Sequence, residues 1–287
     1  MKISSIIATY NRRDELKNLL ISIKNQTYGG FEVVIVDQNA DERVYTLVEE
    51  LHFPSKKIKV IHYHRNNLSE ARNRGIEGAT GEIFFFPDDD SVLPNSFFVK
   101  VADLFEKNKE MDFLSVRVIE NSTIEPPLEE IDCIPITIKN ARSLTTASSV
   151  LLRREVIEDI GNFDPHLGLG GMFESSEDLD FVLRVLNKKY RGYFYTSTFI
   201  IHENPVKVYD ENTARRAYRY NRGFGAVVRK HLKMVGNKYL LLLFICESLR
   251  NIVTMLIHLL RNPWRAKYNF LSLRGKIEGF LKYGKLT

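Results

Sequence analysis

The sequence predicts an α/β fold: a mainly parallel sheet flanked by helices, with a C-terminal helical extension. Strand and helix patterns alternate over the first 120 residues, which is typical of repeated βαβ units. The segment FEVVIVD at 31–37 is a near-continuous apolar run, as in a strand that a parallel sheet buries on both faces. Beyond about residue 210 only helical patterns remain.

The elements of the first half follow in order from these patterns. The expected strands are 3–9, 31–37, 58–63, 81–87 and 111–120. The expected helices between them are 12–27, 41–52, 69–79 and 93–108. Leu16, Leu19 and Ile23 fall on one face of the first of these helices. Ser69 is the expected N-cap of helix 69–79.

The second half is less regular. Residues 121–143 contain three prolines and are expected to form a loop. A strand at 147–154 and a helix ending at Gly161 follow. Residues 164–176 are Gly-rich without a period, and we expect a flexible loop there. A helix at 176–189 and short strands at 192–201, ending at His202, complete this part.

Length and cysteine content limit the class of protein. A chain of 287 residues suits one large domain, or one domain with an appendage. Cys133 and Cys246 are the only cysteines, and they form no CxxC pattern, which argues against a disulfide framework and a structural zinc site. The first residues are expected to form a buried strand rather than a signal peptide, because their apolar run is short and meets charged residues at once. These features favour the cytoplasm.

Polar residues follow three of the expected strands. Thr9-Tyr10-Asn11 comes after the first strand, Asp37 after the second, and Asp88-Asp89-Asp90 after the fourth. Ligands of parallel α/β sheets bind beyond these carboxyl ends. Three adjacent carboxylates repel one another unless a cation compensates, and oxygen ligands of this kind suit Mg²⁺ or Mn²⁺. The alternative is a solvated turn, because DDDS before Pro94 is also good loop chemistry.

Five segments, taken in order, resemble the family 2 glycosyltransferases, which are inverting enzymes of the GT-A fold. They are IIATYNRRDEL, FEVVIVDQN, LSEARNRGIEGATGEIFFFPDDD, ASSVLLRREVIEDIGNFD and SSEDLDFVLRVL, and they cover most of residues 1–205. The resemblance implies a GT-A catalytic domain at 1–210, with a Rossmann-like nucleotide-sugar half at about 1–120 and an acceptor half at about 121–210. It does not extend to the helical region at 211–287.

The resemblance assigns roles in binding a nucleotide-sugar. It implies that Thr9, Tyr10 and Asn11 line the nucleotide pocket and that Asp37 accepts a hydrogen bond from the base. Arg72 would lie near the base or the diphosphate, although Arg74 is close enough in sequence to compete for this role. A strand-end cap is the alternative for Asp37, and a solvated helix position is the alternative for Arg72.

The acid triple would hold the metal and the donor. By the resemblance, Asp88 and Asp90 are the two acids of a DxD motif, with Asp90 on the metal and Asp88 acting towards the ribose or through water. Asp89 is grouped with the donor site without a firm role. The implied cofactor is Mn²⁺ or Mg²⁺. His202 would complete the metal site, although a lone His is more often structural.

An inverting displacement also needs a base for the acceptor hydroxyl. The family pattern places this base at Asp178, with Glu177 orienting the acceptor. Ser176 stands where the pattern usually has Gly. The alternative is that these acids cap the positive end of a helix, and Asp180 is interpreted as a first-turn acid.

The C-terminal region is basic and amphipathic. Residues 261–287 carry seven Lys or Arg and one Glu, so the net charge of +5 for the whole chain belongs to this tail. The segment 239–260 is strongly apolar, but polar residues recur at 247, 251, 254, 258 and 261 and form one stripe. This pattern favours a helix on a membrane surface over a spanning one. A homo-oligomer contact remains an alternative, and nucleic acid is disfavoured because no nucleic-acid motif occurs.

These observations predict a metal-dependent inverting glycosyltransferase. It would move a sugar from a nucleotide donor, expected to be UDP-linked, to a hydroxyl of a glycan or lipid-linked acceptor in the synthesis of a cell-surface polysaccharide or glycoconjugate. The expected location is the inner face of the cell membrane, with peripheral contact through 239–287. The alternatives are a sugar-1-phosphate nucleotidyltransferase, for which the loop after the first strand lacks glycine, and a non-catalytic glycan-binding or scaffold protein.

Overall fold

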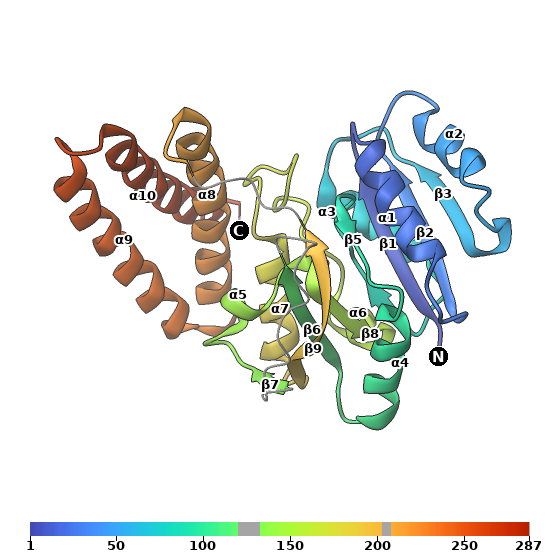
Figure 1. Ribbon diagram of the computed structural model, residues 1–287. Coiled ribbons are helices and arrows are strands. Elements are labelled where there is room, and N and C mark those ends of the chain that lie inside the picture. Colours follow the sequence, from blue (N-terminus) through green and yellow to red (C-terminus); the bar gives the residue numbers. More distant parts are fainter. Residues whose placement is uncertain (120–132, 203–207, 287) are drawn as a thin grey trace. The chain divides into compact units, whose positions relative to one another are not determined.

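The computed structural model describes residues 1–119, 133–202 and 208–286 (Figure 1). The chain forms two compact units. The first, here called the sheet unit, comprises Met1–Asn66, Glu70–Phe163 and Phe181–Asn204. The second, the helical unit, comprises Asn67–Ser69, Asp164–Asp180 and Pro205–Thr287. Most of the loop predicted at 121–143 lies outside the described residues.

The sheet unit is built on one nine-stranded sheet of described residues, in the order β3-β2-β1-β4-β8-β6-β9-β5, with β7 paired to β9. Strands β3, β2, β1 and β4 run parallel, as the βαβ pattern predicts. The strands are β1 Ile3–Thr9, β2 Phe31–Asp37, β3 Ile58–His62, β4 Ile83–Phe85, β5 Ser91–Val92, β6 Phe113–Ile119, β7 Cys133–Ile136, β8 Val150–Arg153 and β9 Gly192–His202.

Helices cover both faces of this sheet. The neighbouring residues Ile6 and Ile7 of β1 belong to two different hydrophobic clusters, one on each face. One cluster takes its helical residues from α1, α2 and α4, and the other takes them from α5, α6 and α7. The helices are α1 Asp14–Lys24, α2 Arg43–Glu50, α3 Leu68–Gly78, α4 Phe97–Lys107, α5 Ala141–Leu144, α6 Arg154–Ile160 and α7 Glu177–Asn187, with short 3₁₀ turns at Ser55–Lys57 and Ala147–Ser149. The predicted α/β class is therefore confirmed.

The structure also corrects parts of the prediction. The sheet is more mixed than expected, because four of its pairings are parallel and four are antiparallel. Residues 133–143 fall in the segment expected to be irregular, but β7 and most of α5 lie there, and Pro135 is tolerated because β7 pairs only with β9 among the described residues. The short strands expected near the end are one continuous strand, β9. Ser69 lies inside α3 rather than capping it, and its hydroxyl donates to the Leu167 carbonyl at 2.8 Å.

The helical unit contains three long helices, α8 Glu211–Val235, α9 Lys238–His258 and α10 Pro263–Tyr283, drawn in orange to red in Figure 1. Asp210 caps α8 by accepting from the Thr213 amide at 2.7 Å. Helices α8 and α10 pack very closely. A Cβ placed on Gly279 would lie 1.9 Å from the Arg222 carbonyl oxygen, so only glycine allows this contact.

Helix α9 turns its polar stripe inward. Lys276 of α10 is fully buried and pairs with Glu247 at 2.8 Å, and Asn251 is buried beside α10. The apolar side of α9 is exposed, with Leu249 57%, Leu256 62% and Leu260 93% accessible in this region. Among the described residues, α9 is the one helix long and apolar enough to cross a membrane by length and composition.

Candidate active site

A connected polar network lies at the carboxyl ends of β1 and β2. The buried Asp37 carboxylate accepts hydrogen bonds through Oδ1 from the amide and side chain of Asn39, at 3.0 and 2.7 Å. Asn39 in turn accepts from the amide of Asn11, which adopts a left-handed conformation (φ 59°). Asp37 Oδ2 has no hydrogen-bond partner within the described parts of the chain, and His62 Nδ1 lies 3.5 Å from it. A buried acceptor is thus left free at the end of β2, and Tyr10, which follows the strand residue paired with Asp37, is exposed.

Two of the three adjacent aspartates meet His202. Its Nε2 lies 3.0 Å from Asp90 and 3.9 Å from Asp88. Strand register explains the meeting, because β5 begins directly after the acid triple and pairs Ser91 with His202 in β9. The hydrogen bond to Asp90 raises the pKa of His202 above its usual value. Burial opposes ionisation of Asp90, but His202 and Arg12 outweigh it and hold the pKa of Asp90 below its usual value.

Arg12 also belongs to this cluster, although the sequence analysis did not select it. Its guanidinium lies 3.2 Å from Asp90 and 4.0 Å from Asp89, and it bonds Glu15 at 2.9 Å. Its position directly after Thr9-Tyr10-Asn11, at the carboxyl end of β1, is the sequence signal that marks it. Arg12 and His202 together balance part of the negative charge of the acid triple.

Asp89 is placed differently from its neighbours. It accepts a hydrogen bond from the hydroxyl of Thr9 at 2.8 Å, and burial raises the pKa of its carboxyl to about 6. This contact ties the carboxyl end of β1 to the loop after β4. Asp89 therefore holds the two segments together, which separates it from Asp88 and Asp90.

The structure distinguishes the two candidate arginines of α3. Arg72 is 2% exposed, lies 3.2 Å from Asp88 and stacks on the Phe163 ring at 5.5 Å. Arg74 is exposed and pairs with Glu77, one turn along the same helix. Arg72, and not Arg74, is therefore the arginine at the acid cluster.

The cluster of Asp88, Asp90 and His202 fits a divalent metal ion. One ligand atom from each residue lies within 4.8 Å of the other two, and all three residues are partly accessible. Two carboxylates suit Mg²⁺ and Mn²⁺, and an imidazole ligand favours Mn²⁺ of these two. Positions left free by the protein could be filled by water and phosphate oxygens.

Glu177 and Asp178, here called the ED motif, belong to the helical unit. Glu177 is buried and Asp178 is half-buried, and both stand in the first turn of α7. Asp178 accepts from the amide of Leu179 at 2.7 Å. Gly168 lies close to this turn with φ +81°, and a Cβ there would come within 3.2 Å of the Glu177 carboxylate. Glycine at position 168 therefore leaves room for the Glu177 side chain in this turn.

The segment 164–176 has no helix or strand, as predicted, but it is extensively bonded within the helical unit. Ser175 donates its hydroxyl to the Tyr220 carbonyl of α8 at 2.9 Å. We expected a flexible loop here, whereas the structure shows a segment that is hydrogen-bonded to α8 through Ser175.

Asp180 is a buried anchor rather than a free first-turn acid. It is fully buried and lies 2.9 Å from Lys230 Nζ and 3.0 Å from His231 Nε2, both on α8. Lys230 also pairs with Asp164 at 2.8 Å, and Tyr283 of α10 donates to the same carboxylate at 2.9 Å. The two ends of the segment 164–180 are therefore held by one buried ionic cluster.

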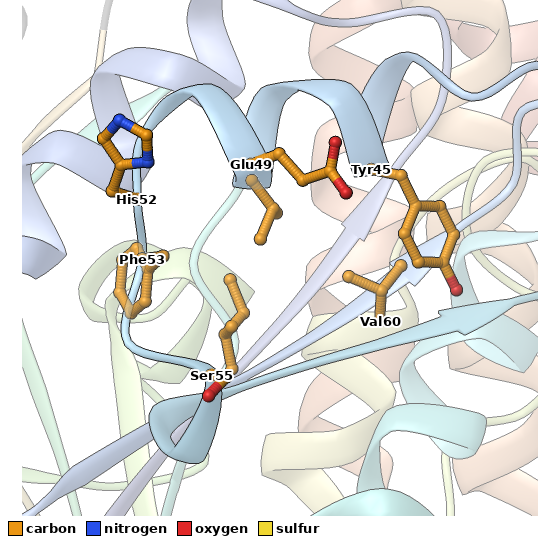
Figure 2. Close-up of a pocket in the computed structure, with 8 residues that line it drawn as sticks. Tyr45, Glu49, His52, Phe53, Ser55 and Val60 are labelled. Carbon is orange, nitrogen blue, oxygen red and sulfur yellow. The ribbon is translucent and has the colours of Figure 1, made fainter.

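A separate cavity of about 560 Å³ lies beside α2 and β3 (Figure 2). Tyr45 and Val60 lie at one end of it, and His52 and Phe53 lie at the other. Its walls are mainly apolar, and none of the predicted site residues lines it. We assign it no part in the site.

The α/β sheet and the acid cluster at its carboxyl edge fit the GT-A class that the sequence resembles. Residues 4–161 match the model of the family described as glycosyl transferase family 2. This is more than half of the chain, and the protein belongs to this family.

Individual proteins are similar over different lengths. An uncharacterized glycosyltransferase of Haemophilus influenzae is 31% identical over 194 residues, which cover 65% of this chain and 62% of that protein. Mannosyltransferase PcManGT from Pyrobaculum calidifontis, solved with GDP-Man and Mn²⁺, has a TM-score of 0.64 at 17% identity and covers 96% of this chain and 87% of that one. S. aureus TarS 1-349, solved with UDP-GlcNAc, has a TM-score of 0.59 at 17% identity, with coverages of 96% and 91%. These two likenesses confirm the GT-A fold.

Proposed function

We propose that the protein is a metal-dependent inverting glycosyltransferase that takes a sugar from a UDP-linked donor. The acceptor is a hydroxyl group of a glycan or a lipid-linked glycan, and the pathway makes a cell-surface polysaccharide or glycoconjugate. Membership of glycosyl transferase family 2 supports sugar transfer and leaves the nucleotidyltransferase alternative without support.

The observation that carries the proposal is the convergence of donor-binding groups at one edge of the sheet. Asp37 offers a free buried oxygen for a base N–H, and Tyr10 offers an exposed ring for stacking. Arg72 lies beside Asp88 and suits a diphosphate, since its guanidinium can bond two oxygens at once. Asp88, Asp90 and His202 would hold Mn²⁺, which stabilises the charge that grows on the leaving diphosphate.

The second requirement is a base for the acceptor. In our proposal Asp178 removes the proton of the attacking hydroxyl, and Glu177 orients the acceptor. Asp178 is half-buried and so remains accessible, whereas Asp180 is fully buried and held by two cations. The choice of Asp178 over Asp180 follows from this difference.

Calorimetry of UDP with and without Mn²⁺ tests the donor site. We expect UDP to bind more tightly with Mn²⁺, and Asp90→Ala or His202→Ala to remove most of this gain. The matched control is Asp159→Asn, an exposed acid on α6 paired with Lys188, which should bind like the wild type. If Asp90→Ala retains the full Mn²⁺ effect, the metal assignment is wrong.

Transfer assays test the base. Asp178→Asn keeps the shape of the side chain but cannot take a proton, so kcat should fall by about 10²-fold or more. UDP affinity should not change, because the donor groups lie elsewhere in the chain. Near-wild-type transfer by Asp178→Asn would exclude it as the base. Screening UDP-, GDP- and dTDP-sugars for slow hydrolysis identifies the donor and separates an enzyme from a non-catalytic scaffold.

The helical unit supports peripheral membrane contact at the cytoplasmic face. Leu249 and Leu256 are exposed on the apolar side of α9, and Leu260 is exposed just beyond its end. Basic residues including Lys238, Arg250 and Arg261 are exposed on or near the same helix and suit anionic lipids. Its polar side is occupied by Lys276 of α10, which favours a helix lying on the surface.

Vesicle sedimentation tests this contact. The wild type should bind vesicles with anionic lipid more strongly than neutral ones, and Leu249→Glu with Leu256→Glu should abolish binding. The control is Val99→Glu, an exposed apolar position on α4 in the sheet unit. If the double variant instead changes the protein from dimer to monomer in light scattering, the apolar face is a homo-oligomer contact.

A further inference from the structure

The helical unit contains a concave site that the proposed donor and base residues do not use. Its volume is about 840 Å³, and its walls come from the first turns of α8, from α10 and from the segment before the ED motif. Four arginines and two acids supply its charged groups, and these are Arg215, Arg216, Arg219, Arg274, Asp210 and Glu174. The site is therefore strongly basic.

Much of this positive charge is not neutralised. Arg216, Arg219 and Arg274 make no ion pair with any carboxylate in the described part of the chain, whereas Arg215 pairs with Glu211 at 2.9 Å. Asp210, whose carboxylate caps α8 through Thr213, offsets only part of this charge.

Two of the unpaired arginines are held in place by aromatic rings. The Arg216 guanidinium lies 5.0 Å from the centre of the Tyr220 ring and donates to its hydroxyl at 3.2 Å. The Arg274 guanidinium lies 5.6 Å from the Tyr218 ring. Stacking orients a guanidinium while leaving N–H groups free to bond another ligand. These exposed side chains therefore lie against tyrosine rings and keep N–H donors available at the cavity.

The arginine side chains of the cavity indicate the class of ligand that it would bind. Unpaired guanidinium groups arranged around a concavity suit a phosphate or diphosphate, which accepts paired N–H donors. The N-terminal end of α8 is already capped by the Asp210 carboxylate, so the arginines are the groups that favour an anion here. Glu174 lines the cavity four residues before Asp178, in the segment that Ser175 ties to α8.

We propose that this arginine-lined cavity binds a phosphate or diphosphate group carried by the acceptor. The inference rests on the proposed transfer activity and adds the class of acceptor, a hydroxyl compound bearing a phosphate group. The phosphate can belong to a lipid or to a soluble polymer. In either case it is bound by the helical unit, which also carries Asp178.

The binding test needs no knowledge of the acceptor and no transfer activity. Inorganic pyrophosphate is titrated by calorimetry with EDTA present, so that the metal cluster does not contribute. The variants are Arg216→Gln with Arg274→Gln, and the same pair changed to Lys. The control pair is Arg154→Gln with Arg191→Gln, two arginines of the sheet unit whose exposed side chains lie outside the cavity. Each charged hydrogen bond lost should weaken binding by about tenfold or more, and the Lys pair should weaken it less.

A second arm uses neutral vesicles containing a small fraction of a polyprenyl phosphate. Loss of vesicle or pyrophosphate binding in the Gln pair, with the control pair unchanged, supports the proposal, and the probe that binds indicates a lipid or soluble source. Wild-type affinity of the Gln pair for every probe that the wild type binds, or no phosphate probe bound by the wild type, overturns it. UDP binding and donor hydrolysis report separately on the proposed function.

Discussion

Lys230→Met tests whether the buried ionic cluster stabilises the helical unit. Lys230 lies 2.8 Å from Asp164 and 2.9 Å from Asp180, and their side chains are 13%, 11% and 0% exposed. Methionine keeps most of the apolar stem but removes the cation that two buried carboxylates share. His231 and Tyr283 still contact one carboxylate each, but neither replaces the lysine charge.

The expected loss is large. Removing one partner of a buried ion pair costs about 3–5 kcal/mol, because a buried charge is left uncompensated. The free energy of unfolding, measured by urea denaturation at pH 7, should fall by this amount. The control is Lys188→Met, whose partner Asp159 is 3.1 Å away with side chains 55% and 42% exposed. That exposed pair should contribute at most about 1 kcal/mol.

The pH dependence gives an independent check. Burial opposes ionisation of Asp164, but Lys230 and the other donors outweigh it, so the pKa of Asp164 is lowered. A lowered pKa contributes stability that is present above the unfolded pKa, about 4, and is lost as pH falls through the folded pKa. Without Lys230, burial should raise the pKa of Asp164 instead. Protonation of this carboxylate in acid should then stabilise the variant. The stability difference between wild type and Lys230→Met should therefore begin to shrink above about pH 4, as the variant takes up a proton, and shrink further below about pH 4, as the wild type loses the contribution of its ion pair.

Two results would refute the reasoning. One is a loss at pH 7 no larger than that of Lys188→Met, which would mean that the cluster is hydrated and worth no more than a surface pair. The other is a stability difference that stays constant from pH 7 to pH 3, which would mean that the loss comes from packing rather than charge.

Two further predictions concern single atoms in the two units. Asp37→Asn replaces an oxygen acceptor of the buried carboxylate and should weaken UDP binding by about tenfold or more, measured by calorimetry; unchanged affinity would exclude Asp37 from base recognition. Gly168→Ala places a Cβ at φ +81° and 2.9 Å from the Ser69 hydroxyl, and should cost about 1–2 kcal/mol in unfolding free energy. Gly236→Ala, in the left-handed region at φ +63° with open space around it, separates backbone strain from the clash, and an equal cost for both would show that the clash contributes nothing.

The sequence predicted the parallel half of the sheet well because each buried strand there is a continuous apolar run. In the antiparallel half it predicted β6, β8 and β9 as strands but not their directions, and it did not predict β5, because that strand is only two residues long and follows three aspartates, so no pattern marks it as a strand. Yet this short strand decides the site: its pairing with β9 brings His202 to Asp90. The resemblance placed both residues at the metal, but the backbone pairing that unites them is a long-range property.

Arg12 and Asp180 show the other limit of sequence reasoning. Each is a charged residue one or two positions from a motif, and its type alone does not say whether it faces solvent. Arg12 reaches the acid triple across the carboxyl edge of the sheet, and Asp180 meets Lys230 and His231 fifty residues later in the chain. Burial of these charges is decided by partners that no local pattern identifies.

The stripe on α9 was predictable in its period but not in its direction. Polar residues every three or four positions show that the helix has two faces, and the usual expectation is that the apolar face packs against protein. Here Lys276 on α10 is buried and needs a carboxylate, and Glu247 supplies it, so the polar face turns inward. The apolar face is then left outside, and its exposure follows from one buried lysine. If Lys276→Met is made together with Glu247→Met, the inward face becomes apolar as well, and we expect α9 to lose its fixed orientation against α10 while vesicle binding persists.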